Sequence, residues 1–119
     1  MCLGETRPIR LRKKDHIIAW KVVQRYGGKL YGFIFDEVIY EKYNDATKHR
    51  IPYCVIYSDR NVGVFSCYET SVQARRIAMK YGCSHMVARV KLSGNLVRDE
   101  HGEVAGRFME ILNYDELIN

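Results

Sequence analysis

A single segment of this chain has the pattern of an amphipathic helix. Thr70-Ser71-Val72-Gln73 forms a capping box, in which the Thr70 hydroxyl accepts from the Gln73 amide while the Gln73 side chain reaches back. Apolar residues follow at helical spacing as one stripe, namely Ala74, Ile77, Ala78 and Tyr81. Gly82 ends the pattern, because glycine readily closes a helix. We therefore predict one principal helix over about residues 71–81, with its stripe facing a sheet.

The other ordered segments have the pattern of strands. Met86 to Leu92 alternates between apolar and mostly polar positions, as a half-buried strand does, and Ser93-Gly94-Asn95 then supplies a hairpin turn. A polar loop is expected over residues 44–50. Further extended segments are expected at residues 17–23, 30–35, 38–43, 53–57, 63–67, 96–98 and 104–112. Because most of them are joined by hairpin-type turns, the sequence predicts an α+β fold, an antiparallel-rich twisted sheet with the principal helix packed on it.

The length of the chain limits it to one core. A chain of 119 residues, 47% of them hydrophobic, suffices for one domain but not for two. We expect a basic, irregular N-terminal arm over residues 1–15 and a single α+β domain over residues 16–119. No apolar stretch approaches the roughly 20 residues of a membrane span, and no signal peptide follows Met1. We therefore expect a cytoplasmic protein that does not enter a membrane.

The positive charge of the chain is concentrated near its start. The net charge is +5, and residues 1–25 carry seven basic and two acidic residues, whereas the remainder carries twelve of each. An attraction for anions therefore belongs to this segment, as a lid over an anionic ligand or a strap onto nucleic acid. A solvated tail is the alternative. The candidate anion-binding residues are Arg10, Arg12, Lys13, Lys14 and Lys21.

The sequence lacks the motifs of the common enzyme and metal classes. It contains no phosphate-binding loop, nucleophile elbow or zinc-hydrolase helix. Its four cysteines include no C-x-x-C pair, and Cys83-Ser84-His85 does not have the usual spacing of zinc ligands. We therefore expect reduced thiols and neither a metal nor a cofactor. We also expect no catalytic residue.

Tyrosine is abundant, with nine residues in the chain. Most of them are explained by packing within strands. Exposed tyrosines beside Lys and Arg also suit a protein–protein interface, or a nucleotide pocket in which a ring stacks on the base. We select Tyr31 and Tyr57 as the rings that would contact a partner. The partners left open are a protein, a nucleotide-like anion, nucleic acid bound through the arm, and a second copy of the chain.

Two parts of the chain resemble small proteins encoded by phages and mobile elements. The first is Met1-Cys2-Leu3 followed by the run from Asp15 to Val23. The second is Gly63 to Cys67, a helix containing Ala74, the strand from Met86 to Gly94, and the closing Met109-Glu110-Ile111-Leu112. This resemblance implies a phage accessory factor that disables a host defence. It would act without catalysis, by binding a host protein or by sequestering a nucleotide-like signal in the bacterial cytoplasm.

A second resemblance is to ADP-ribosyltransferase-like folds. In that family a strand with the pattern Gly-x-Phe/Tyr-Phe/Ser precedes a helix with small residues, and here Gly63-Val64-Phe65-Ser66 precedes the helix at Ser71. The chain departs from the family pattern in two places. Trp20-Lys21 stands where the family has a His-Gly, Tyr-Gly or Arg-Gly pair, and no Gln/Glu-x-Glu motif is present. An enzyme of this class would use Ser66, Tyr81 and Glu110, and it is the alternative function.

Overall fold

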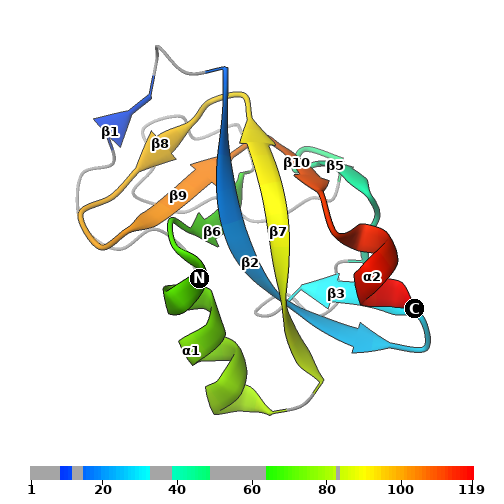
Figure 1. Ribbon diagram of the computed structural model, residues 1–119. Coiled ribbons are helices and arrows are strands. Elements are labelled where there is room, and N and C mark those ends of the chain that lie inside the picture. Colours follow the sequence, from blue (N-terminus) through cyan, green and yellow to red (C-terminus); the bar gives the residue numbers. More distant parts are fainter. Residues whose placement is uncertain (1–8, 12–14, 33–38, 49–63, 83) are drawn as a thin grey trace.

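The computed structural model describes residues 9–11, 15–32, 39–48, 64–82 and 84–119 (Figure 1). These residues form ten strands and two helices. The strands are β1 (Ile9–Arg10), β2 (His16–Tyr26), β3 (Lys29–Gly32), β4 (Ile39–Tyr40), β5 (Tyr43–Asp45), β6 (Phe65–Tyr68), β7 (His85–Ser93), β8 (Val97–Arg98), β9 (Glu103–Gly106) and β10 (Phe108–Ile111). The helices are α1 (Ser71–Tyr81) and α2 (Tyr114–Ile118).

All of the described strands belong to one antiparallel sheet. Its order is β1-β8-β9-β6-β2-β7-β10-β5, and β3 and β4 extend from the far end of β2. The longest pairing joins β2 to β7, from His16 opposite Ser93 to Gln24 opposite His85. This topology confirms the prediction of an antiparallel-rich α+β fold. Strands make up more of the structure than that prediction suggested.

The described residues form three apolar clusters: a main core on the inner face of the sheet, a smaller cluster on its outer face, and a third that contains Val64, Val97 and Ala105. On the inner face, Ala19 and Val23 of β2 and Val90 of β7 join the main core, to which β3, β4, β6, β9, β10 and α2 also contribute. The sheet curls around this core, so that the Tyr40 ring of β4 and the Phe65 ring of β6 lie 5.9 Å apart between centroids. On the outer face a smaller cluster forms under α1. The rest of the outer face carries no described element, and Figure 1 shows α1 beside only one end of the β2–β7 pair.

The structure confirms the predicted helix. Thr70 Oγ1 accepts from the Gln73 amide at 3.3 Å, and Gln73 Oε1 accepts from the Thr70 amide at 3.2 Å. The helix ends at Gly82, whose φ of 110° lies in the region that favours glycine. Ala74 and Ala78 are buried against the sheet. Tyr81, however, is 52% exposed and does not complete the predicted stripe, because it lies in the last turn, where the helix ends.

Several boundaries differ from the sequence-based expectation. The strand expected over residues 104–112 is divided into β9 and β10, and the segment expected over residues 38–43 contains β4 and only the first residue of β5. The polar loop expected over residues 44–50 is wrong at its start, because Asn44 and Asp45 belong to strand β5 and pair with β10. The N-terminal arm is not irregular where it is described. Ile9–Arg10 pairs with β8, and the Leu11 amide donates to the Leu96 carbonyl at 2.8 Å. In these last two places a distant strand supplies the backbone partners that the local sequence does not reveal. The strand expected over residues 53–57 lies outside the described residues.

Candidate functional site

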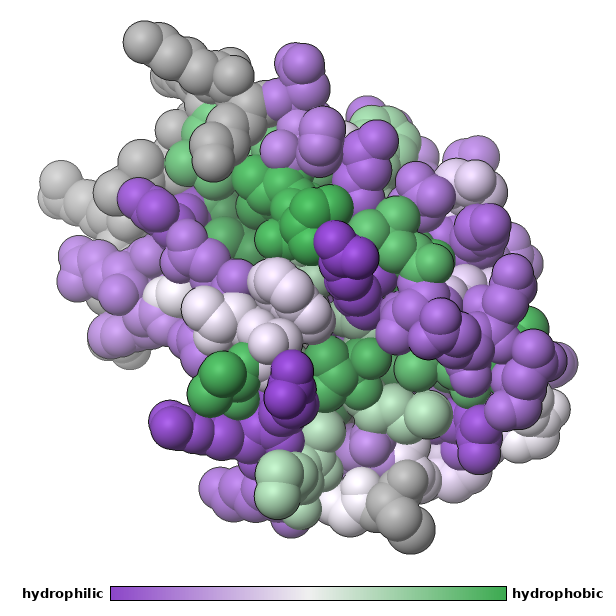
Figure 2. Space-filling view, viewed as in Figure 1, coloured by the Kyte–Doolittle hydropathy of each residue, from purple (hydrophilic) through white to green (hydrophobic). Residues whose placement is uncertain are grey.

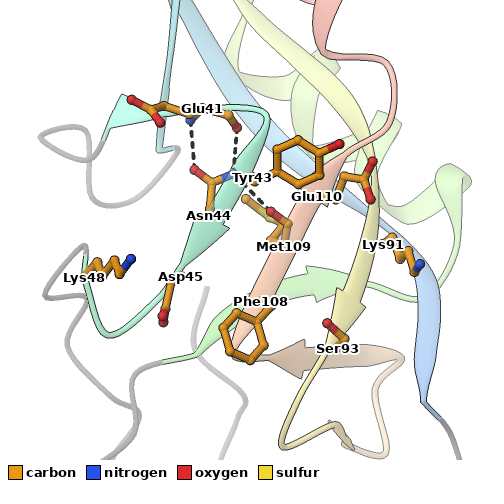
Figure 3. Close-up of a pocket in the computed structure, with 10 residues that line it drawn as sticks. All are labelled: Glu41, Tyr43, Asn44, Asp45, Lys48, Lys91, Ser93, Phe108, Met109 and Glu110. Atoms are coloured by element: carbon orange, nitrogen blue, oxygen red, sulfur yellow. Dashed lines mark hydrogen bonds between the residues drawn. The ribbon is translucent and has the colours of Figure 1, made fainter.

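A groove of about 580 Å³ lies at the end of the sheet formed by β5, β10 and β7. Ten residues from these strands and the adjoining turns line it, and Figure 3 labels them. The register places Tyr43 opposite Glu110 and Asp45 opposite Phe108, so these four side chains share one face of the sheet. Met109 and Ile111 alternate with them and lie in the core. We call this outward surface the β5–β10 groove.

Two aromatic side chains stand exposed in the groove. Tyr43 is 68% exposed and Phe108 is 41% exposed. Exposed rings are common at protein interfaces, because they bury much area for little loss of conformational freedom. Charged and polar side chains line the groove beside these two rings. The groove surface is therefore mixed in character, which is typical of a recognition surface.

Asn44 fixes the backbone from which Tyr43 projects. Its side chain is buried, with 5% exposure. Its Oδ1 accepts from the Glu41 amide at 2.8 Å, and its Nδ2 donates to the Glu41 carbonyl at 2.7 Å and to the Met109 carbonyl at 3.2 Å (Figure 3). These three bonds tie the turn before β5 to β10. The position of the Tyr43 backbone is thus set before any partner arrives.

A second set of contacts fixes Phe108. The Arg107 guanidinium lies 4.7 Å from the centre of the Phe108 ring and also donates to both carboxylate oxygens of Asp45, at 3.2 and 3.4 Å. Burial alone would raise the pKa of Asp45, but the bonds from Arg107 and Thr47 outweigh it and lower that pKa to about 2. The ring also packs close to Gly94, where a Cβ atom would lie 2.9 Å from Phe108 Cδ2. Phe108 therefore contacts both Arg107 and Gly94.

The charges lining the groove do not favour a phosphate. Three carboxylates, those of Glu41, Asp45 and Glu110, face two ammonium groups, those of Lys48 and Lys91. Asp45 forms a salt bridge with Arg107. The remaining two carboxylates and two ammonium groups balance, whereas a phosphate site usually contains an excess of cations. Lys91 and Glu110 are neighbours in register across β7 and β10. Balanced charge around exposed rings suits a protein surface that carries both signs.

The residues predicted to bind a partner do not come together in the described part of the chain. Arg10 lies in β1 at one end of the sheet order, whereas Tyr31 lies in β3 on the branch beyond β2. The Tyr31 ring contacts the Tyr26 ring edge to face, with centroids 6.0 Å apart. Arg12, Lys13, Lys14 and Tyr57 lie outside the described residues.

Lys21 takes a different role from the predicted one. It lies two positions from both Ala19 and Val23, so it shares their face on the core side of β2. Its Nζ donates to the Ser66 carbonyl at 2.7 Å and lies 5.8 Å from the centre of the Tyr40 ring. Burial would lower the pKa of Lys21, but the nearby Tyr40, Cys67 and Glu103 side chains together outweigh it, and the pKa is raised. The charge is thus retained, and its described contacts are internal.

The three residues of the alternative enzyme do not form one site. Ser66 lies on β6 and Glu110 on β10, with β2 and β7 between them. Neighbouring strands are about 4.8 Å apart, which separates these two positions by about 14 Å across the sheet. Tyr81 lies at the end of α1, where its ring is 5.7 Å from that of His85. This arrangement gives no support to a shared reaction centre.

A buried polar cluster lies under the start of α1. The Tyr68 hydroxyl, Asp99 Oδ2 and Glu103 Oε2 are buried and have no hydrogen-bond partner among the described residues. Tyr68 and Glu103 are opposite each other across β6 and β9. Burial, with the Glu103 carboxyl beside it, raises the pKa of Tyr68 to about 12. Burial and the neighbouring Asp99 raise the pKa of Glu103. Within the described part of the chain, no group of three His, Cys, Asp or Glu residues could hold a metal ion.

Of the groove residues, only Glu110 is a sequence-based candidate, and only for the alternative enzyme. Phe108 alternates with the buried Met109, and this pattern within the expected strand over 104–112 indicates that Phe108 faces outward. Tyr43 gives no comparable signal, because β5 has only three residues. Nothing in the local sequence pairs these two rings.

Comparison of the chain with protein-family models, curated proteins and solved structures gives no significant match. Among the described residues, no helix has the length and apolar character needed to cross a membrane. The function is therefore argued from the geometry of the β5–β10 groove.

Proposed function

We propose that the protein is a non-enzymatic binding protein that docks onto another protein through the β5–β10 groove. The observation that carries this proposal is the pair of exposed rings, Tyr43 and Phe108, each positioned by neighbouring contacts. Preorganised aromatic side chains with charged neighbours are the usual source of binding energy at interfaces. The resemblance to phage and mobile-element proteins gives the partner class, which is a protein of a bacterial defence system.

The balance of charge in the groove separates this proposal from nucleotide sequestration. Tyr43 and Phe108 could stack on a base, but the two lysines that line the groove are accompanied by Glu41 and Glu110, which would repel the phosphates. Phosphate recognition usually depends on several unopposed cations. A protein partner needs no such excess. The nucleic-acid alternative depends on the N-terminal arm, whose basic residues 12–14 lie outside the described residues.

The test compares two variants against a captured partner. Protein immobilised on beads captures partners from bacterial lysates, and each partner is then purified and its Kd measured directly. We expect the double variant Tyr43→Ser/Phe108→Ser to weaken binding at least thirtyfold, or about 2 kcal/mol. The control is Tyr26→Ser, which removes a ring that is 54% exposed on the β2–β3 hairpin. It should leave the Kd unchanged.

Two results would contradict the proposal. The first is a partner that binds the double variant as tightly as the unaltered protein, which would place the interface elsewhere. The second is a covalent change in the partner, such as added ADP-ribose after incubation with NAD, because that would show an enzyme. Sedimentation of the protein alone shows whether a second copy occupies the groove, since the double variant would then shift the oligomer to monomer.

A further inference from the structure

The outer side of α1 is basic and carries exposed apolar residues. Val72, Arg75, Arg76, Met79 and Lys80 are all exposed, and we call them the α1 outer surface. Met79 is 83% exposed and Val72 is 54% exposed. The helix contains no acidic residue. In Figure 2, strongly hydrophilic residues lie beside apolar ones at the lower left, where Figure 1 shows α1.

The orientation of this surface is fixed by the opposite side of the helix. Ala74 and Ala78 pack with Val22 and Tyr68, and the capping box holds the first turn. The helix therefore cannot rotate to bury Met79 without exposing its inner stripe. Arg75 donates to the Ser71 hydroxyl at 3.3 Å. Among the described residues, none of the three cations on this surface forms a salt bridge, so their charge is available to a partner.

We infer that the α1 outer surface binds an acidic segment of a protein partner that places an apolar side chain on Met79. Methionine and arginine are enriched at protein interfaces, and the flexible thioether adapts to different apolar side chains. Arg75, Arg76 and Lys80 would surround that contact and pair with carboxylates. This inference uses a different surface from the β5–β10 groove and does not depend on the function proposed for it.

Other anionic partners fit the surface less well. A nucleic-acid backbone offers phosphates at every step, whereas here the apolar Met79 is 83% exposed among the cations. An anionic membrane would need the wide apolar side of the helix to insert, and that side is packed on the sheet. An acidic protein segment satisfies both features, since carboxylates and an apolar side chain occur together in it.

The test uses a defined probe and the full chain. The probe is a fluorescein-labelled 14-residue peptide with six Asp or Glu residues around a central Leu-Phe pair, and binding is followed by fluorescence anisotropy at low salt. We expect saturable binding that Arg76→Glu weakens at least tenfold and Met79→Ser at least threefold. Lys29→Glu is the matched control, because it makes the same charge change at an exposed residue of β3 and should weaken binding less than twofold.

Three further probes make the result decisive. They are the same peptide with Ser-Ser in place of Leu-Phe, a 14-base-pair DNA duplex, and vesicles of phosphatidylcholine with phosphatidylserine. We expect each to bind more weakly than the parent peptide. The inference is overturned if the parent peptide does not bind, if Lys29→Glu weakens it as much as Arg76→Glu does, or if DNA or vesicles bind more tightly and depend on Arg76. Circular dichroism of each variant confirms that the fold is retained.

Discussion

Replacing Asn44 by alanine tests whether the groove is built in advance. The substitution removes three hydrogen bonds, to the amide and carbonyl of Glu41 and to the carbonyl of Met109. A typical bond contributes about 0.5–1.5 kcal/mol net, and the Asn44 side chain is buried, so the loss should be about 2–4 kcal/mol. The single tryptophan, Trp20, reports unfolding by fluorescence in a urea titration. With a slope of about 2 kcal/mol per molar urea, the midpoint should fall by roughly 1–2 M.

The variant Asn44→Asp tests the acceptor role of the Asn44 side chain separately from its donor role. It keeps an oxygen for the Glu41 amide at the 2.8 Å contact, but it places a second oxygen against two carbonyls. At pH 7 it should be at least as unstable as Asn44→Ala, and it should recover at low pH, when a protonated carboxyl donates to one carbonyl. A loss below about 1 kcal/mol in Asn44→Ala, or an Asn44→Asp variant as stable as the unaltered protein, would refute this reasoning.

Two other changes test the site and the buried cluster. Gly94→Ala should lower the free energy of unfolding by about 1–2 kcal/mol, because φ is +73°, and should also weaken partner binding by displacing Phe108. The control Gly28→Ala, with φ of +76° and nothing within 4 Å, should lower the free energy of unfolding alone. Urea titration and Kd measurement of both variants check this. Burial and Asp99 raise the pKa of Glu103, so the native state favours its protonated form and loses this stability as pH rises above the ordinary value of 4.5. Glu103→Gln should therefore unfold at a higher temperature than the unaltered protein at pH 8 and show a smaller difference at pH 4, and equal melting temperatures at both pH values would contradict this.

Local chemistry explains the elements that the sequence predicted well. The α1 helix needs only a capping box at Thr70, an apolar stripe and Gly82, all within 13 consecutive residues, and these signals act before any tertiary contact forms. The β2–β3 hairpin is similar, because Gly27 and Gly28 both take positive φ at the turn. Signals of this kind determine an element without reference to the rest of the chain.

The errors arise where a side chain takes a role that depends on a distant partner. Asn44 is of a residue type that is typical of loops, because its side-chain amide can form hydrogen bonds with nearby backbone groups. In the structure it makes those bonds at the start of a strand, since β10 supplies the pairing. Lys21 is predicted to bind an anionic partner, yet it donates a hydrogen bond to the Ser66 carbonyl, 45 positions away, inside the curled sheet.

The sequence alone determined the helix, most of the strands and the segregation of positive charge, because each depends on neighbouring residues. The tertiary structure decided the candidate site. Tyr43 and Phe108 share one face of the sheet only because β5 pairs with β10, and the bond from Asn44 to Met109 in that pairing joins residues 65 positions apart. Strand register between distant segments follows from packing of the whole core, where Met109 and Ile111 face inward and so direct Phe108 outward. A short strand such as β5 carries too little pattern to specify that register by itself.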